Sequence, residues 1–307
     1  MKKIKDILDK YDINILRYSY INNAVIVDSN KGKFVLKKKK RNDKKELYDY
    51  LLSRNFSFFL YPENDTNDDY EIYQYITSIK TVKEEKAISL INIVSLLHNK
   101  TTTYKEYTLD EIKEIYESKS DYINYLYNYY SELEEVFSNS VYPSPYELLF
   151  LNNVSKIYNC LNFSKVIVEE WYNLCIKDRR KRIVFLHNHL SLDHFIDISD
   201  PKLINFDYSK YDSPVYDFVK FYKEHYYELD MINLFNLYQH KYRFTDSELL
   251  LFFIEIIIPK KIKFSNNTCN NTIIVGELID YVDTTRNFIL KEKKKQEKED
   301  NNKLNKE

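Results

Sequence analysis

The sequence contains very little glycine, proline or cysteine. Of its 307 residues, 2 are glycine, 6 are proline and 3 are cysteine. So few glycines and prolines exclude a collagen-like chain, a turn-dense all-β fold and a phosphate-binding loop built from several glycines. The cysteines, Cys160, Cys175 and Cys269, are isolated and odd in number, so they predict neither a disulfide framework nor a cysteine-rich zinc site. They fit a reducing compartment.

An excess of charge of either sign is also lacking. Lys and Arg number 46 and Asp and Glu 47, so the formal net charge of −1 provides no general attraction for nucleic acid. The longest apolar run, residues 249–258, is only ten residues long and contains Glu255, and the first residues are charged before any apolar segment forms. We therefore expect a cytoplasmic protein with no nucleic acid and no membrane as partner.

Apolar and aromatic residues are abundant. They include 30 Tyr and 18 Phe, and hydrophobic residues make up 44% of the chain, which is enough to form a sizeable core. The length predicts about two domains or lobes. Tyrosines between residues 116 and 130 alternate with Ile and Leu at helical spacing, which favours packing over base stacking.

The first 76 residues show a pattern typical of a small β-rich lobe. Strand signals cover residues 13–20, 24–28, 33–37, 58–61 and 70–76. The turn at Ser29-Asn30-Lys31-Gly32 joins the second strand to the third, and a helix begins near Asp43. We therefore predict a five-stranded antiparallel sheet with one helix, in the order βββαββ.

From residue 77 onward the apolar period becomes that of helices. Helix signals begin near residues 81, 108, 144, 164 and 214, and short strands are expected at residues 183–186, 195–198 and 203–206. The predicted fold class is α+β, with a small lobe at residues 1–76 and a mainly helical lobe at residues 77–290. Residues 291–307 are almost all charged or amide-bearing and are predicted to form a frayed helix extension or a disordered tail.

One region combines several His, Asn and Asp residues within about 30 positions. Residues 187–194 read His-Asn-His-Leu-Ser-Leu-Asp-His, residues 204–207 read Ile-Asn-Phe-Asp, and residues 212–217 read Asp-Ser-Pro-Val-Tyr-Asp. This region resembles the H-G-D-x-x-x-x-N, I-D-[FW] and D-x-P-x-x-D motifs of the aminoglycoside and choline phosphotransferases, and also the spore-coat kinase-like branch of that group. The resemblance covers about residues 11–290 and implies a bilobal, protein-kinase-like fold.

The resemblance also implies roles for individual residues, with ATP and Mg²⁺ as cofactors. Lys37 corresponds to the lysine that pairs with nucleotide phosphates and with a helix glutamate, here Glu46. His189 stands at the position of the general base. His194 and Asn205 stand at the positions of the two magnesium ligands.

His189, His194 and Asn205 are all substitutions, because the motifs have Asp, Asn and Asp, respectively, at these three positions. Loss of a positioned general base alone costs about 10²–10⁴ in rate, and weaker metal ligands add to that loss. We therefore predict a catalytically impaired, pseudokinase-like protein with a ligand-binding or scaffold role, whose partner is a nucleotide, another small molecule or a protein.

Two other functions stay open. Asp193 and Asp207 lie one and two residues from the substituted metal positions and could bind a cation, while His189 could accept a proton. The protein would then be an active ATP-dependent phosphotransferase acting on a hydroxyl of an aminoglycoside, choline or a sugar-like substrate. The spore-coat resemblance implies a third function, in coat or assembly.

Plainer roles also stay open for several of these residues. Lys37 begins a run of five basic residues, and such runs usually form a solvated face. Glu46 fits a helix cap, and Asp193 fits a turn. His187, His189 and His194 could together bind zinc, although the resemblance already gives His187 a structural role.

Overall fold

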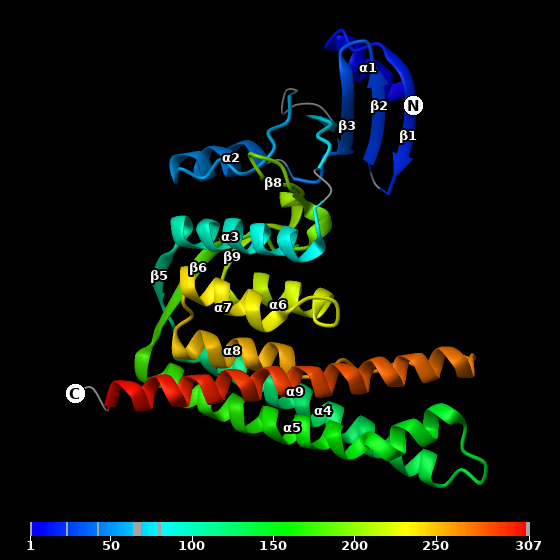
Figure 1. Ribbon diagram of the computed structural model, residues 1–307, viewed down its shortest axis with the longest axis vertical. Helices are drawn as coiled ribbons and strands as arrows, with labels where there is room; N and C mark the ends of the chain where they lie inside the picture. The colour runs from blue at the N-terminus through cyan, green and yellow to red at the C-terminus, as the bar shows by residue number, and fades with distance from the viewer. Residues whose placement is uncertain (1, 23, 42, 64–68, 79–80, 305–307) are drawn as a thin grey trace. The chain divides into compact units, whose positions relative to one another are not determined.

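The computed structural model describes residues 2–22, 24–41, 43–63, 69–78 and 81–304, and it forms two compact units (Figure 1). Unit 1 comprises residues 1–101 and 187–210, and unit 2 comprises residues 102–186 and 211–307. Each unit is therefore built from two separate stretches of chain. The predicted lobe boundaries at residues 76 and 290 follow the sequence pattern and stay predictions.

Unit 1 contains a four-stranded antiparallel sheet. Its strands are β1 (Ile15–Ile21), β2 (Ala24–Ser29), β3 (Gly32–Lys38) and β4 (Tyr70–Gln74), hydrogen-bonded in that order. Alternate apolar residues of β2 and β3 face one side, as the period of two predicts. They pack with Ile4, Ile7 and Leu8 of helix α1 (Lys2–Lys10) to form the core of the sheet.

The turn between β2 and β3 sets the register of β3. Gly32 has φ of +115°, a conformation that other residues rarely adopt, and Ser29 Oγ donates a hydrogen bond to the Gly32 carbonyl at 2.7 Å. With Ser29 opposite Gly32, Lys37 lies opposite Ala24 of β2. On its other side, β3 pairs with β4, where Lys37 lies opposite Glu71.

The predicted fifth strand is reduced to a single bridge, which is a correction of the predicted strand number. Within the described residues, residues 58–61 form only the parallel bridge between Phe59 and Leu203. The Phe59 ring stacks on Tyr48 at 4.6 Å and also lies edge-on to Phe206. This segment is therefore held by its side chains more than by strand pairing. Helix α1 was not predicted, although Ile4, Ile7 and Leu8 have helical spacing.

Two helices of unit 1 follow the predicted apolar pattern. Helix α2 (Lys44–Ser53) buries Leu47 and Leu51. Helix α3 (Lys83–Thr101) buries its predicted face, which comprises Ala87, Leu90, Ile91, Val94, Leu97 and His98. The expected cap of α2 is absent, because Asp43 makes no side-chain hydrogen bond to the helix and instead pairs with Arg41.

Unit 1 is completed by the second stretch of chain. It contains the 3₁₀ turns η1 (Leu192–His194) and η2 (Phe206–Tyr208) and the short strands β7 (Phe195–Ile196) and β8 (Lys202–Leu203). Strands β7 and β8 pair with each other, and they bring residues 187–194 close to residues 204–208.

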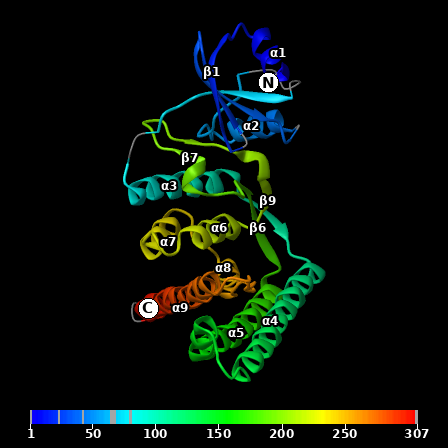
Figure 2. The same cartoon turned by 90° about the vertical axis from the view of Figure 1, so that its right-hand side faces the viewer.

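Unit 2 is mainly helical, as predicted. A small sheet has the order β5 (Thr103–Glu106), β6 (Arg180–Leu186) and β9 (Lys210–Asp212). The helices are α4 (Leu109–Ser138), α5 (Pro145–Asp178), α6 (Val215–His225), α7 (Met231–Lys241), α8 (Asp246–Ile257) and α9 (Thr268–Leu304). Helices α4 and α5 lie side by side in Figures 1 and 2.

Capping boxes begin three of these helices, at Thr108 with Glu111, at Ser144 with Glu147 and at Thr245 with Glu248. Helix starts near the first two were expected. The helices predicted near residues 144 and 164 are one continuous helix, since no glycine or proline follows Pro145 within it. The charged residues from 291 onward continue α9 as far as Leu304, and their disorder in solution stays a prediction.

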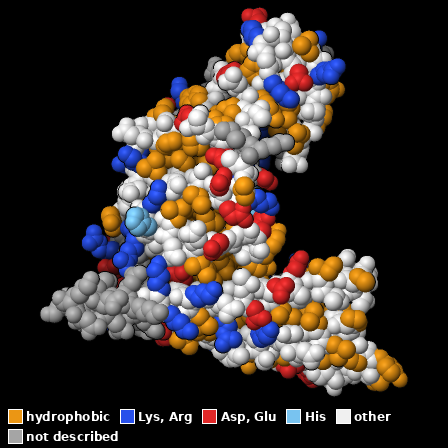
Figure 3. All heavy atoms as spheres, viewed as in Figure 1, with side chains coloured by type: hydrophobic (Ala, Val, Ile, Leu, Met, Phe, Trp, Pro, Cys, Tyr) orange, Lys and Arg blue, Asp and Glu red, His pale blue; other side chains and the backbone are white. Residues whose placement is uncertain are grey.

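Many of the tyrosines and phenylalanines of unit 2 are buried and pack between its helices. Tyr130 is fully buried on α4, and Phe218, Phe235 and Phe252 form part of an aromatic cluster between helices. In the described residues, no helix is both long and apolar enough to cross a membrane. Figure 3 shows side chains of both charge signs across the face in view, with apolar side chains between them.

Candidate functional site

His187 anchors the loop that resembles a catalytic loop. Its side chain is fully buried, and its Nε2 lies 2.8 Å from the carbonyl oxygen of Ile204. Asn188 donates a second bond, from Nδ2 to the carbonyl oxygen of Tyr208, at 2.7 Å. These bonds hold the loop against residues 204–208 and place His189 and His194 beside Asn205.

Asn205 lies at the centre of a network of polar side chains. Its backbone is left-handed, with φ of 71° and ψ of 50°, which asparagine tolerates better than most residues. Its Oδ1 accepts a hydrogen bond from Lys37 Nζ. Its Nδ2 lies 3.2 Å from His189 Nδ1 and 3.0 Å from His194 Nε2.

Both imidazoles face the amide nitrogen of Asn205. An amide nitrogen only donates hydrogen bonds, so the facing nitrogens of His189 and His194 are the acceptors of these contacts. His194 Nδ1 lies 2.8 Å from the carbonyl oxygen of His189. Asn205 thus directs its oxygen to a lysine and its nitrogen to two imidazoles.

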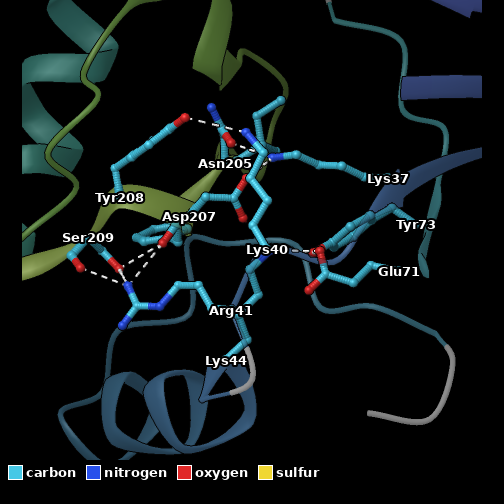
Figure 4. A network of polar contacts seen from close by, with 12 residues as sticks. Lys37, Lys40, Arg41, Lys44, Glu71, Tyr73, Asn205, Asp207, Tyr208 and Ser209 are labelled. Carbon is cyan, nitrogen blue, oxygen red and sulfur yellow. Dashed lines mark hydrogen bonds and ion pairs between the residues drawn. The ribbon is translucent and has the colours of Figure 1, made fainter. Parts of the chain in front are cut away.

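Asp207 is the second central residue, and two lysines hold it. Its side chain is only 1% exposed, one oxygen pairs with Lys37, and the other lies 2.6 Å from Lys44 Nζ. Lys44 Nζ is also 2.6 Å from Glu71 Oε2, which accepts a further bond from Tyr73 at 3.1 Å. Figure 4 shows these side chains converging from β3, α2, β4 and η2. We call the four residues Lys37, Asp207, Lys44 and Glu71 the charge chain.

The charge chain keeps Asp207 ionised. Burial raises the pKa of the Asp207 carboxyl, but hydrogen bonds and attraction from the Lys37 and Lys44 ammonium groups outweigh that effect and hold this pKa below its ordinary value. At neutral pH, Asp207 is therefore a carboxylate with an ammonium group on each oxygen.

Further cations surround residues 205–209. Arg41 donates from Nη1 to the Ser209 carbonyl oxygen and to Ser209 Oγ, each at 2.7 Å, while its other nitrogens pair with Asp43. Lys40 is exposed, and its Nζ lies 3.4 Å from the Tyr208 hydroxyl. Lys40 is therefore the cation of this site that solvent or a ligand reaches most readily.

The structure brings together most of the predicted site residues but not all of them. Lys37, His189, His194, Asn205 and Asp207 form one connected network. The other two residues, Glu46 on α2 and Asp193 in η1, are exposed, and the ion-pair partner of Lys37 is Asp207.

Lys44 and Glu71 were not predicted as site residues, although the position of Lys44 at the start of its helix is unusual for a lysine. A lysine in the first turn of a helix lies at the positive end of the helix dipole, which is unfavourable. Such a residue needs a compensating anion, and here Lys44 has two. No local pattern identifies Glu71, because its partner lies 27 residues earlier in the chain.

The donor groups of this site do not fit Mg²⁺. This ion requires nearly octahedral oxygen ligands at about 2.0–2.1 Å. Here the Asn205 oxygen and both Asp207 oxygens face ammonium groups, and the Asn205 nitrogen faces His194. In the part of the chain that the structure describes, no three His, Cys, Asp or Glu side chains form a group that could hold a metal ion. A zinc site at the three histidines therefore has no support either.

Comparison with known proteins shows similarity in fold but not in sequence. No protein-family model matches the sequence, and no curated protein matches it. Among solved structures, aminoglycoside phosphotransferase from Alicyclobacillus acidocaldarius matches with a TM-score of 0.72 over 95% of this chain and 96% of that chain, at 9% identity. The fold is that of an aminoglycoside phosphotransferase.

A second similar structure is the AMP-bound complex of spectinomycin phosphotransferase. It matches with a TM-score of 0.55 at 12% identity, over 92% of this chain and 97% of that chain. The same enzyme in complex with ADP and spectinomycin matches with a TM-score of 0.51 at 11% identity, over 94% and 98% of the two chains. The predicted kinase-like phosphotransferase fold is thus confirmed, and the spore-coat resemblance stays a prediction.

Proposed function

We propose that this kinase-like protein binds a nucleotide, or another anionic small molecule, through the cations around Asn205 and Asp207, and that it is impaired in phosphoryl transfer. The observation that carries the proposal is the charge chain. In the charge chain, the buried Asp207 carboxylate pairs with Lys37 through one oxygen and with Lys44 through the other. Both of its oxygens are therefore already occupied.

The impairment follows from the roles that phosphoryl transfer requires. The transferred phosphoryl group carries charge that metal ions neutralise, and a positioned base orients the attacking hydroxyl. Here the charges that could meet a phosphate are ammonium groups. His189 has an imidazole that accepts from the Asn205 amide, so its Nδ1 is occupied. Loss of the base alone corresponds to about 2.7–5.5 kcal/mol of additional barrier.

Ligand binding does not depend on those lost roles. Ammonium groups bind phosphate as point charges, without a metal ion. Lys40 is exposed, and the Lys37 side chain is 19% exposed, so both can reach a ligand at the surface of unit 1. The AMP and ADP complexes of spectinomycin phosphotransferase support a nucleotide as the ligand.

The binding part of the proposal is tested by thermal shift with ATP. Ligand at 100 times its Kd stabilises a protein by about 2.7 kcal/mol, so wild type should melt at higher temperature. Lys40→Met should reduce the shift without unfolding unit 1, because Lys40 is exposed. Lys45→Met, an exposed neighbour on α2, should leave the shift unchanged. Equal shifts in all three proteins would contradict ATP binding at this site.

The impairment is tested by turnover of ATP labelled on the γ-phosphate, with Mg²⁺ and a panel of aminoglycoside, choline and sugar acceptors. Wild type should show no transfer above the background of the His189→Ala variant. Clear transfer by wild type that this variant loses would instead support the active phosphotransferase that the resemblance also implies.

A further inference from the structure

Unit 2 contains a second group of lysines, around a cavity of about 460 Å³. The walls come from the end of α6, from residues 260–263 between α8 and α9, and from the start of α9. In Figure 1, α8 lies between α6 and α9. Volumes of about 300–1,000 Å³ are typical of pockets for small molecules. All of the lining residues belong to unit 2, so this cavity is separate from the network around Asn205.

The charge of the lining is strongly positive. It includes Lys223, Lys260, Lys261 and Lys263, against a single carboxylate, Glu277. Among the described residues, no carboxylate oxygen lies within ion-pair distance of Lys223, Lys260 or Lys263. Glu255 does attract Lys223, but Glu255 is itself paired with Lys119 at 2.6 Å.

Lys223 is the lysine of this lining whose charge is the least favourably placed. It is half-buried on α6, and burial lowers the pKa of its amine, while Lys119 and Lys260 lower it further by repulsion. A cation held away from water without a paired anion is unfavourable. An anion in the cavity would relieve that cost, and it would also relieve the repulsion between the lysines.

The cavity wall is fixed before any ligand arrives. Tyr130 on α4 donates a hydrogen bond to the Lys260 carbonyl oxygen at 2.8 Å, and Tyr129 donates to the Ile262 carbonyl oxygen at 2.9 Å. The Lys261 ammonium lies 4.2 Å from the centre of the Tyr129 ring. These contacts hold the lysine-bearing segment in one conformation, so little ordering is needed when a ligand binds.

We infer that this cavity is a binding site for a small phosphate-bearing molecule. The ammonium groups of Lys223, Lys260 and Lys263 would pair with the phosphate oxygens. The rings of Tyr226 and Tyr281, which also line the cavity, would contact the less polar part of the molecule. The positive lining argues against a cationic ligand here.

Pyrophosphate serves as the probe in a calorimetric titration, against sodium chloride at equal ionic strength. Wild type should bind pyrophosphate, and Lys223→Met should weaken binding by about tenfold or more. The same substitution should raise the melting temperature without ligand, because it removes a half-buried unpaired charge. Lys177→Met, an exposed lysine on α5 outside the cavity, should change neither quantity.

Two further variants keep the test decisive if Lys223→Met does not fold. Lys263 is exposed, so Lys263→Met should fold and should weaken pyrophosphate binding, whereas Glu277→Gln should strengthen it by removing the opposing charge. No binding by wild type, or binding that these variants leave unchanged, would overturn the inference. Loss of pyrophosphate binding in Lys40→Met alone would place the anion at the other site and would overturn it as well.

Discussion

At the scale of the residue, Lys44 is a buried charge held by two carboxylates. Its side chain is 6% exposed and lies between the carboxylates of Asp207 and Glu71, each at 2.6 Å. Removing one partner from a buried ion pair leaves an uncompensated charge and typically costs about 3–5 kcal/mol. We expect Lys44→Met to lower the free energy of unfolding by about that amount in urea denaturation.

Lys45 offers a matched control for this prediction, because it is the next residue on α2 and is exposed. Lys45→Met should change the free energy of unfolding by less than about 0.5 kcal/mol. Adding Glu71→Gln to Lys44→Met should cost little more, since it neutralises the carboxylate left without its lysine. Similar losses in Lys44→Met and Lys45→Met would show that the charge chain does not contribute to stability.

Asp207 gives a pH dependence of definite sign. Its pKa is lower in the folded protein than in the unfolded chain, so its contribution to stability is present above the ordinary carboxyl value of about 3.9 and is lost as the pH falls through the lower folded value. Asp207→Asn should therefore be clearly less stable than wild type at pH 6, and the difference should shrink below about pH 4. Urea unfolding at a series of pH values measures this, and a difference that grows in acid would contradict it.

At the scale of the element, the two glycines of the chain make a direct comparison. Gly32 has φ of +115°, whereas Gly276 lies in α9 without a positive φ, and an added Cβ would meet nothing within 4 Å at either residue. The difference between them is therefore one of backbone conformation. Gly32→Ala should cost about 1–3 kcal/mol through strain, and Gly276→Ala should stabilise by about 0.5–1 kcal/mol.

Thermal unfolding of the two alanine variants tests this prediction. Because the Gly32 turn sets the register that places Lys37, Gly32→Ala should also weaken the ATP-induced shift, whereas Gly276→Ala should not. If both substitutions stabilised the protein, the turn would not be the constraint that we describe.

Elements with local signals were predictable, and those that depend on distant partners were less so. The strands β1 to β3 follow from alternating apolar residues and the Gly32 turn, and α3 follows from its buried face. The segment 58–61 has the composition of a strand, but its one bridge is to Leu203, a residue about 140 positions away. The sequence pattern alone does not show whether the residues around Leu203 form a strand long enough to pair with the whole segment.

At the scale of the whole molecule, the sequence predicted the fold more completely than it predicted the contacts within the site. His189, His194, Asn205 and Asp207 lie in one connected network, because a short loop and a strand pair connect them, and their functional roles stay predictions. The motif did not predict that Asp207 would bind two lysines. That pairing depends on Lys44, which comes from a different element and which only the folded chain brings close.

The central claim is that the cations of unit 1, and not a magnesium ion, hold the phosphates of the ligand. The most direct test is the Kd for ATP, measured by calorimetry with Mg²⁺ and then with EDTA. Lysines attract free ATP, with its greater negative charge, at least as strongly as its magnesium complex, so Mg²⁺ should leave the affinity unchanged within about threefold or weaken it. Tightening by tenfold or more with Mg²⁺ would contradict the account.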